Sequence, residues 1–429
     1  MDTGNTQMKT LSRRDFVIGA TVTAASASMV TSSKPIIAEN KRRTIRHAII
    51  GMGSRSRAHV QEFSAIPHCE IVAVCDVDSN RMAKVPARIS KHADYREILD
   101  DPAIDSVSIT TPDHWHTPLA AAAMKAGKHV YIEKPCSHTI AEGQYLEKAA
   151  RTYGKVIQHG TQGRSSEGYK AGVQFMRDGH LGKVHVAKAI NHQLRAPIGR
   201  APETDVPDGV DYDLWTGSAP KHPFTKNRWH YNWHWFWDYG AGDIANDGVH
   251  HIDLARWGLG VEYPNAVSAS GGQFFYDDDH ETPDTQLVTY EYENCHLIYE
   301  MRLWTDYALE GHDNGAVFYG EKGRLEMGRK GCTVTSKNGE TRNLGGPADL
   351  TAHVENFIDA IRSSEKVSLA APIREGSISS SLCHLGNIAT RVGRKLTLDT
   401  TGLQCIQDDE ANALFSKRYR AGYELPKIG

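Results

Sequence analysis

A glycine-containing loop near residue 50 is the part of the sequence whose residue types most directly indicate chemistry. Residues 45–53 form a short apolar run that ends in glycines, and the loop Gly51-Met52-Gly53-Ser54-Arg55-Ser56 then precedes a helix-like segment. In such a loop the first glycine makes a tight turn, and the second lets the backbone approach a pyrophosphate at the helix N-terminus. The third small position is Ser56 rather than glycine, so the match to G-x-G-x-x-G is incomplete.

An acidic residue at the end of the next apolar run strengthens this interpretation. Asp76 lies 23 residues after Gly53, where a carboxylate accepts hydrogen bonds from the hydroxyls of an adenosine ribose. The pair predicts a dinucleotide site, and the negative charge favours NAD because it would repel the 2′-phosphate of NADP. NADP stays possible, since Arg55, Arg57 and Arg81 are placed where they could accept that phosphate. The alternative is a glycine turn and a surface aspartate in another α/β fold.

Two further groups follow later strand-like segments: Thr111-Pro112 with His116, and Glu133-Lys134-Pro135. Together with the loop and Asp76, they make the chain resemble the glucose–fructose oxidoreductase/inositol dehydrogenase/MocA (Gfo/Idh/MocA) family between about Thr44 and Val392. The resemblance implies a Rossmann domain followed by a larger α/β domain with an open sheet. Because that sheet is often used for self-association, we expect a homo-oligomer.

The resemblance also implies roles for these residues. Lys134 would hydrogen-bond the reacting oxygen and relay a proton, while Thr111 and Pro112 would shape the backbone around the nicotinamide. His116 would line the cofactor face, and Glu133 belongs to the same cofactor-binding set. The alternatives are a solvent-exposed lysine at a strand end and a histidine that only begins a helix.

A second signature runs from Gly240 to His250 and continues to Asp253. It resembles the start of the family's active-site helix, where an acid and a histidine four residues apart face the substrate, so His250 is the expected proton acceptor. Asn246 stands where an aspartate is commonest; it can hold a substrate hydroxyl or orient the imidazole but adds no negative charge. Asp243 or Asp253 could supply that charge. The alternative is that His250 is a structural histidine.

An aromatic segment at residues 227–239 resembles the exported, sugar-associated branch of the family. Tryptophans mixed with Arg, His, Asn and Asp suit a pocket that stacks on sugar C–H faces and binds hydroxyls. We therefore predict substrate contacts from Trp235, Asp238 and Tyr239. The alternative is that these aromatic residues belong to the hydrophobic core.

The elements that must position these residues are predicted from the pattern of apolar runs. Strand-like runs at 106–110, 129–132 and 155–158 alternate with helical segments at 58–65, 118–126 and 140–153, which predicts a doubly wound parallel sheet. A strand at 183–191 and alternating segments at 285–292, 296–303, 316–319 and 324–326 predict a large open, mostly antiparallel sheet, with helices at 169–177, 351–362 and 376–392. The predicted fold class is α/β, with an NAD(P)-binding Rossmann domain at 44–160, a substrate and oligomerisation domain at 161–400 and a tail at 401–429.

The first 40 residues are expected to be a targeting signal. Ser12-Arg13-Arg14-Asp15-Phe16 precedes an apolar, Ala/Thr/Ser-rich stretch, which resembles a twin-arginine signal that the export machinery reads. The stretch is too short and too polar for a stable membrane span, so we expect an exported, periplasmic protein. Because this route carries folded proteins, it suits a cofactor loaded in the cytoplasm. The alternatives are a basic tail and a single anchor helix.

Composition excludes several partners. The chain has 429 residues and a net charge of −3, so no basic surplus predicts nucleic-acid binding. Its seven cysteines include no C-x-x-C pair, and His114-x-His116 and His250-His251 lack the partners of a zinc site. No metal site is predicted.

These observations favour an oxidoreductase that transfers a hydride between nicotinamide and a carbinol of a sugar, amino sugar or polyol. The NAD either exchanges or stays bound and is reduced and reoxidised within one cycle. A second class is NAD-assisted glycoside cleavage, in which transient oxidation of a ring hydroxyl allows elimination of the aglycone without net redox change. A third is a non-catalytic sugar-binding protein with structural NAD.

Overall fold

A six-stranded parallel sheet forms the N-terminal domain in the computed structural model, which describes residues 43–363 and 367–428. The expected targeting signal, residues 1–40, lies outside the described residues. The strand order is β3-β2-β1-β4-β5-β6, which confirms the doubly wound arrangement. The strands are β1 (Ile45–Ile50), β2 (Cys69–Cys75), β3 (Ser90–His92), β4 (Ser106–Ile109), β5 (His129–Ile132) and β6 (Ile157–His159).

Helices cover both faces of this sheet, which explains why its central strands β4 and β5 are buried along almost their whole length. The helices are α2 (Ser56–Ala65), α3 (Tyr95–Asp100), α4 (Asp113–Lys125) and α5 (Ile140–Tyr153). Local signals set their ends: the Thr139 hydroxyl accepts a hydrogen bond from the Glu142 amide at the start of α5, and Gly154 ends that helix with φ +61°.

A nine-stranded sheet forms the second domain, in the order β14-β13-β12-β11-β7-β10-β9-β8-β15. Neighbouring strands are antiparallel except β7 and β10, so the predicted open, mostly antiparallel sheet is confirmed. The strands are β7 (Val184–His192), β8 (Ala266–Gly272), β9 (Thr285–Glu291), β10 (His296–Arg302), β11 (Asn314–Gly320), β12 (Gly323–Gly328), β13 (Gly331–Ser336), β14 (Thr341–Gly345) and β15 (Leu396–Thr397).

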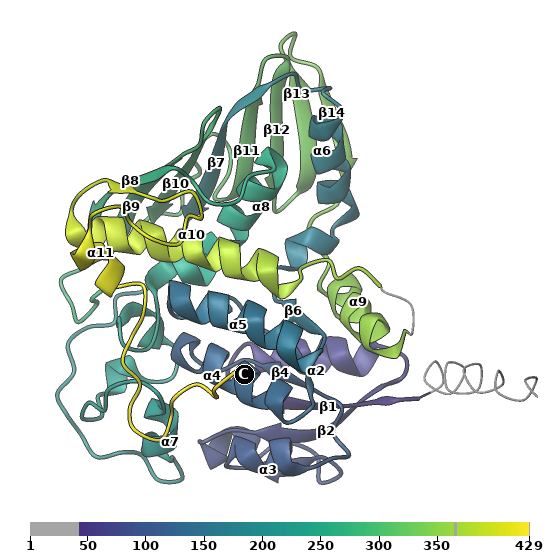
Figure 1. Ribbon diagram of the computed structural model, residues 1–429, viewed down its shortest axis with the longest axis vertical. Coiled ribbons are helices and arrows are strands. Elements are labelled where there is room, and N and C mark those ends of the chain that lie inside the picture. The colour runs from purple at the N-terminus through teal and green to yellow at the C-terminus, as the bar shows by residue number, and fades with distance from the viewer. Residues whose placement is uncertain (1–42, 364–366, 429) are drawn as a thin grey trace, which may run out of the picture.

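Three helices pack on one face of this sheet (Figure 1): α6 (Glu167–Arg177), α8 (Val249–Leu259) and α10 (Ile373–Val392). Of these, α10 also packs on α5 of the first domain. A π-helical turn over Ile244–Gly248 leads directly into α8. It packs tightly on the sheet, because a Cβ atom at Gly248 would lie 2.5 Å from the Tyr299 hydroxyl. The short helices α7 (Tyr212–Thr216) and α11 (Asp409–Ala413) belong to loops of this domain.

Two later segments return to the first domain. Helix α9 (Leu350–Arg362) packs on α2, where Phe357 meets the rings of Phe63 and Tyr131. The C-terminal residues pack there as well, since the Tyr419 hydroxyl donates to Glu142 at 2.7 Å and Tyr423 lies edge-on to Trp115. The N-terminal domain is therefore completed by residues from the far end of the chain.

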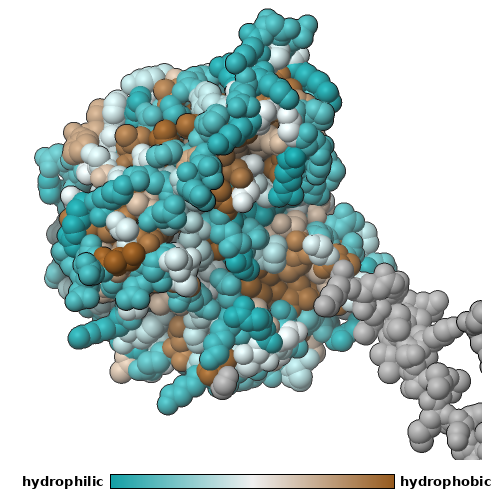
Figure 2. Space-filling model, turned by 45° about the horizontal axis from the view of Figure 1, so that its top comes forward, coloured by the Kyte–Doolittle hydropathy of each residue, from teal (hydrophilic) through white to brown (hydrophobic). Residues whose placement is uncertain are grey.

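One face of the molecule is seen in the space-filling view (Figure 2). Figure 2 shows hydrophilic residues over most of the visible face, with hydrophobic residues in separate patches. Across residues 43–363 and 367–428, no helix has the length and apolar character needed to cross a membrane.

Candidate functional site

A crevice of about 360 Å³ opens at the carboxyl ends of β1 and β4, where the strand order of the parallel sheet reverses. In open α/β sheets this switch point is where ligands bind. The first domain contributes the glycine loop, Asp76, Thr111, Pro112, His116, Glu133 and Lys134 to its lining. The second domain closes the other side with Trp229, His230, Tyr231, Trp233, His234 and Asn246.

The glycine loop is shaped to bring its backbone close to a ligand. Gly51 has φ +96°, and a Cβ atom there would lie 2.8 Å from the Thr110 carbonyl group, so only glycine fits. At Gly53 the nearest atom to such a Cβ is Arg81 Nη1 at 3.8 Å, which leaves space above the loop. The buried Ser56 hydroxyl donates to the Gly53 carbonyl at 2.8 Å and holds the loop at the start of α2.

Asp76 lies on the crevice wall beside this loop. Its carboxylate accepts the Met52 amide at 2.6 Å and the Asp78 amide at 2.8 Å. Burial raises the pKa of Asp76, and these two amides oppose the shift. The carboxylate is thus fixed where a ribose is expected, and the buried Thr111 hydroxyl on the same wall has no partner among the described residues. Both features fit a bound dinucleotide.

Glu133 ties the glycine loop to the strand that carries Lys134. It is buried and accepts hydrogen bonds from Arg55 Nε at 2.7 Å and His59 Nε2 at 2.8 Å. Burial by itself would raise the pKa of Glu133, but the Arg55 guanidinium and His59 hold it well below its usual value. Arg55 is therefore engaged by a carboxylate, although it lines the crevice. His116 links the neighbouring loops, with its ring nitrogens 2.6 Å from the Pro135 carbonyl and 2.8 Å from that of Thr111.

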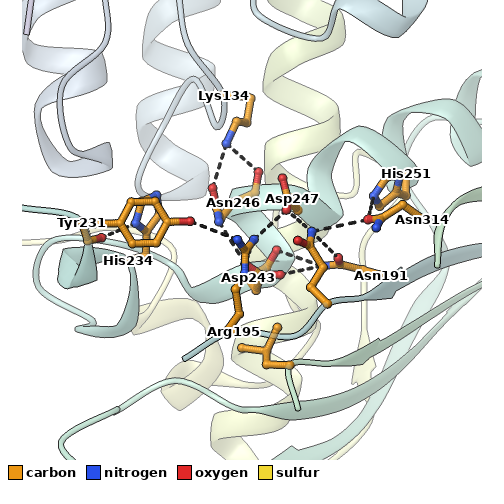
Figure 3. A network of polar contacts seen from close by, with 12 residues as sticks. Lys134, Asn191, Arg195, Tyr231, His234, Asp243, Asn246, Asp247, His251 and Asn314 are labelled. Atoms are coloured by element: carbon orange, nitrogen blue, oxygen red, sulfur yellow. Dashed lines mark hydrogen bonds and ion pairs between the residues drawn. The ribbon is translucent and has the colours of Figure 1, made fainter. Parts of the chain in front are cut away.

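Lys134 and Asn246 meet across the crevice (Figure 3). Lys134 Nζ donates to the Asn246 carbonyl at 2.7 Å and to its side-chain oxygen at 2.9 Å. The Asn246 amide in turn donates to Asp243 Oδ1 at 2.9 Å. Asp243 is buried behind Asn246, where it also accepts Arg195 Nη2 at 2.9 Å and Asn191 Nδ2 at 2.9 Å. The ammonium therefore sits on a network that fixes its position.

His250 lies on a neighbouring cavity of about 380 Å³ rather than on the crevice that holds Lys134. Asp247 lines the same cavity and accepts Arg195 Nη2 at 2.6 Å. Burial and the Lys134 ammonium lower the pKa of His250 to about 3, and Asp247 opposes the shift. The imidazole is therefore neutral at ordinary pH and is a weak base.

The charge beside His250 comes from a residue that the sequence did not single out. Asp243 is paired with Arg195, and Asp253 forms a buried bidentate pair with Arg164 at 2.8 and 2.9 Å. Asp247 is the carboxylate that acts on the imidazole. Its position three residues before His250, one helical turn away, is the signal that could have found it. No comparable signal marks Arg195.

The substrate contacts predicted for Trp235 and Tyr239 are wrong, and the contact predicted for Asp238 stays a prediction. Trp235 and Tyr239 are buried in the hydrophobic core with 1% exposure each. Asp238 pairs with His222 at 2.6 Å and is absent from the crevice lining. Other members of the segment, Trp229 to Tyr231 with Trp233 and His234, line the crevice instead. Among the residues that the structure describes, no group of three His, Cys, Asp or Glu side chains is placed to hold a metal ion.

The fold and crevice define a two-domain protein whose Rossmann domain binds a dinucleotide. Sequence profiles of one family match both domains: "Oxidoreductase family, NAD-binding Rossmann fold" at residues 45–161 and "Oxidoreductase family, C-terminal alpha/beta domain" at 191–425. The chain belongs to the Gfo/Idh/MocA oxidoreductase family.

Relatives and solved structures agree with this assignment. The chain is 27% identical over 285 residues to the uncharacterized oxidoreductase YrbE of Bacillus subtilis, covering 64% of this chain and 71% of that protein. It is 30% identical over 169 residues to an alpha-N-acetylgalactosaminidase of Shewanella oneidensis, a match that spans 36% of this chain and 37% of the relative.

The WlbA dehydrogenase of Chromobacterium violaceum, solved with NADH and UDP-GlcNAcA, has the same fold with a TM-score of 0.67. It is 20% identical, and the match covers 83% of this chain and 97% of that chain. An aldose-aldose oxidoreductase of Caulobacter crescentus gives a TM-score of 0.66 at 19% identity, covering 83% and 100%.

Proposed function

We propose that this protein transfers a hydride between the carbinol carbon of a sugar, amino sugar or polyol and an NAD that remains bound. The observation that carries the proposal is the Lys134 ammonium, held by Asn246 at the point where the glycine-loop crevice meets the second domain. Sugar-related relatives and structural neighbours support the substrate class. When bound, NAD would supply the hydride acceptor.

The chain's own residues would handle the proton. Lys134 is placed to donate a hydrogen bond to the reacting hydroxyl oxygen, and the carbonyl and amide oxygens of Asn246 fix its direction. His250 is neutral because its pKa is lowered to about 3. The same shift makes the imidazole a weak base, so it would take the hydroxyl proton of a substrate that reaches the second cavity only as the C–H bond breaks and the hydroxyl becomes acidic. Asp247 stabilises the protonated ring that results.

NAD rather than NADP is the proposed cofactor. Asp76 presents a carboxylate on the crevice wall, where it would repel a 2′-phosphate. Arg55 is already paired with Glu133, and Arg81 lies 3.9 Å from the Asp78 carboxylate. No guanidinium of this wall is therefore left uncompensated for a phosphate, as far as residues 43–363 and 367–428 show.

A sugar panel tests the reaction directly. Purified protein is mixed with single sugars and polyols, and the absorbance of reduced nicotinamide is followed; at least one compound should reduce the bound cofactor. The variant Lys134→Met should slow that step by at least about 100-fold while NAD binding is kept. The variant Lys125→Met, at the exposed end of α4, is the matched control and should react like wild type. Unchanged turnover in Lys134→Met would contradict the role of Lys134, whereas sugar binding without any reduction of the cofactor would favour the non-catalytic alternative.

Glycoside cleavage is the second candidate because several relatives are described as glycosyl hydrolase family 109 proteins, one of them 34% identical over 164 residues that cover 32% of this chain and 36% of the relative. In that chemistry oxidation of a ring hydroxyl acidifies the neighbouring C–H, the aglycone leaves by elimination, water adds and the hydride returns. Nitrophenol release from nitrophenyl glycosides without added NAD would support it. Reduction of the cofactor by a free sugar, with no such release, would support the oxidoreductase.

We also propose that the chain is exported through the twin-arginine route. The supporting observation is the pair Arg13-Arg14 before an apolar stretch. Replacement of both arginines by lysine should keep the protein in the cytoplasmic fraction, whereas wild type should be recovered from the periplasm. Equal periplasmic recovery of both forms would contradict the proposal.

A further inference from the structure

A segment of the second domain crosses the crevice at the end where Asp76 lies. The Ser79 amide donates to the Gly209 carbonyl at 3.0 Å, and the Asp211 amide donates to the Val77 carbonyl at 2.9 Å. Gly209 has φ +81°, and a Cβ atom there would lie 2.6 Å from the Ser79 hydroxyl. The two backbones therefore touch directly after β2, where the adenosine ribose lies in a Rossmann domain.

Contacts among the side chains of His230, Asp78 and Arg81, which we call the clasp, close the same end of the crevice. His230 Nε2 lies 3.0 Å from Asp78 Oδ2, and Arg81 Nε donates to His230 Nδ1 at 3.2 Å. Since Nδ1 accepts a hydrogen bond, Nε2 carries the proton and donates it to Asp78. Burial and the Arg81 charge lower the pKa of His230 to about 4, so this neutral tautomer persists at ordinary pH.

Aromatic rings form the wall that this clasp anchors. Trp229 lies 3.8 Å from the His230 ring and 5.2 Å from that of Trp215, measured between ring centroids. The hydroxyl of Tyr231 accepts Arg195 Nη1 at 3.1 Å, which joins the wall to the network beneath Asn246. Trp215, Trp229, His230 and Tyr231 all line the crevice. The wall is thus held at both ends, by Asp78 of the first domain and by Arg195 of the second.

We propose that residues 208–234 are part of the cofactor site and retain the dinucleotide through repeated turnovers, with His230 as the positioning residue that closes its adenosine end. This inference rests on the proposed NAD-dependent function. The bound nucleotide leaves only when the His230–Asp78 contact opens, so its dissociation is slower than turnover.

Cofactor exchange on the full-length chain tests the inference. Protein loaded with NADH is mixed with a large excess of NAD, and loss of bound-nicotinamide fluorescence gives the dissociation rate. We expect slow dissociation from wild type and at least tenfold faster dissociation from His230→Ala. His230→Gln, which keeps a donor and an acceptor, should restore much of the retention.

A second histidine of the same region is the control. His222 pairs with the exposed Asp238 and does not line the crevice, so His222→Ala should release NADH as slowly as wild type. Rapid release from wild type, or equal rates in wild type and His230→Ala, would overturn the retention proposal while leaving NAD binding intact. A wild-type chain that binds no NADH at all would overturn the proposed function as well.

Discussion

Asn246 stands where the family resemblance implies an aspartate, and its surroundings explain why an asparagine fits there. Its amide donates to the buried Asp243 carboxylate, while its oxygens accept the Lys134 ammonium. An aspartate in this position would face Asp243 at hydrogen-bond distance. The asparagine therefore satisfies a carboxylate on one side and a cation on the other, which a second carboxylate could not do.

The substitution Asn246→Asp should accordingly destabilise the protein. Two carboxylates would be placed together in a buried site, so either one takes up a proton or they repel each other. We expect a loss of about 2 kcal/mol at neutral pH, measured by chemical denaturation, and a smaller loss near pH 5, where protonation relieves the repulsion. A free energy of unfolding equal to that of wild type would contradict this reading of the network.

The lowered pKa of His250 leads us to expect an unusual pH dependence of the reaction. Burial and the Lys134 ammonium lower its pKa to about 3, so the imidazole stays neutral and able to accept a proton as the pH falls through 6.5. We expect kcat/KM to show no acid limb near pH 6.5, and His250→Asn to lower the rate without changing the profile above about pH 5. An acid limb near 6.5 that disappears in His250→Asn would show that the imidazole titrates normally.

The glycine loop is the element on which cofactor binding depends, and its two glycines have separable roles. Gly51→Ala forces a left-handed backbone and a contact of 2.8 Å with the Thr110 carbonyl, so we expect it to lower both stability and NAD affinity. Gly53→Ala meets no atom closer than 3.8 Å, so it should keep the melting temperature of wild type. Its methyl group would still obstruct the pyrophosphate and weaken NAD binding. Thermal melts and NAD titrations of both variants check this, and equal melting temperatures would contradict it.

The spacing of Asn246 and His250 predicts that both side chains lie on one face of a helix, but the structure separates them. Helical geometry explains the difference. Residues four apart share a face of an α-helix, but Ile244–Gly248 form a π-helical turn, which inserts an extra residue and rotates what precedes it. Asn246 consequently faces the Lys134 crevice, and His250 lines the neighbouring cavity. A π-helical turn has no signature in the residue types of this segment, so the separation could not be predicted.

In the aromatic segment, too, the residue pattern does not determine which way the side chains face. It contains two short 3₁₀ turns, Lys226–Arg228 and Asn232–Trp235, joined by irregular backbone. With neither a period of 2 nor of 3.6, the pattern does not tell which rings face the crevice and which face the core. The residue types therefore predict that the segment lines a pocket, but they do not predict that Trp235 and Tyr239 face the core.

At the scale of the whole molecule, both sheets could be predicted because their strands have distinct patterns. The central strand β4 of the first sheet is buried at every residue, whereas β9 and β10 alternate buried residues with half-buried or exposed ones. The return of α9 and the C-terminal residues to the first domain could not be predicted, since their apolar faces do not specify which surface they cover. Phe357 packs against Phe63 and Tyr131, which lie 294 and 226 residues earlier in the chain.

Histidines that are held neutral in both domains should make the folded protein less stable at acid pH. The pKa is lowered to about 3 for His114, His159, His234 and His250, and to about 4 for His129, His353 and His384. Burial is the largest cause of the lowered pKa in each of them. Between about pH 6.5 and 4 the unfolded chain binds protons that the folded chain does not, so stability is complete above this window and is lost as the pH falls through it.

The melting temperature should therefore drop clearly between pH 7 and pH 5. Each such histidine contributes at most about 1.4 kcal/mol per pH unit. His129→Gln should make the fall of the melting temperature with pH less steep. His185→Gln, at an exposed position on β7, should leave that fall unchanged. A free energy of unfolding that stays constant over this range would contradict the burial of these groups as neutral rings.

The most direct test of the account is the nucleotide content of the purified protein. The full-length chain is purified without added cofactor, denatured, and the supernatant assayed for NAD(H) and NADP(H). We predict about one NAD(H) per chain, because one Rossmann crevice binds one dinucleotide, and much less from Asp76→Ala. A protein that releases no nucleotide and does not bind added NAD, or that releases NADP(H) instead, would contradict the assignment of Asp76 and the crevice.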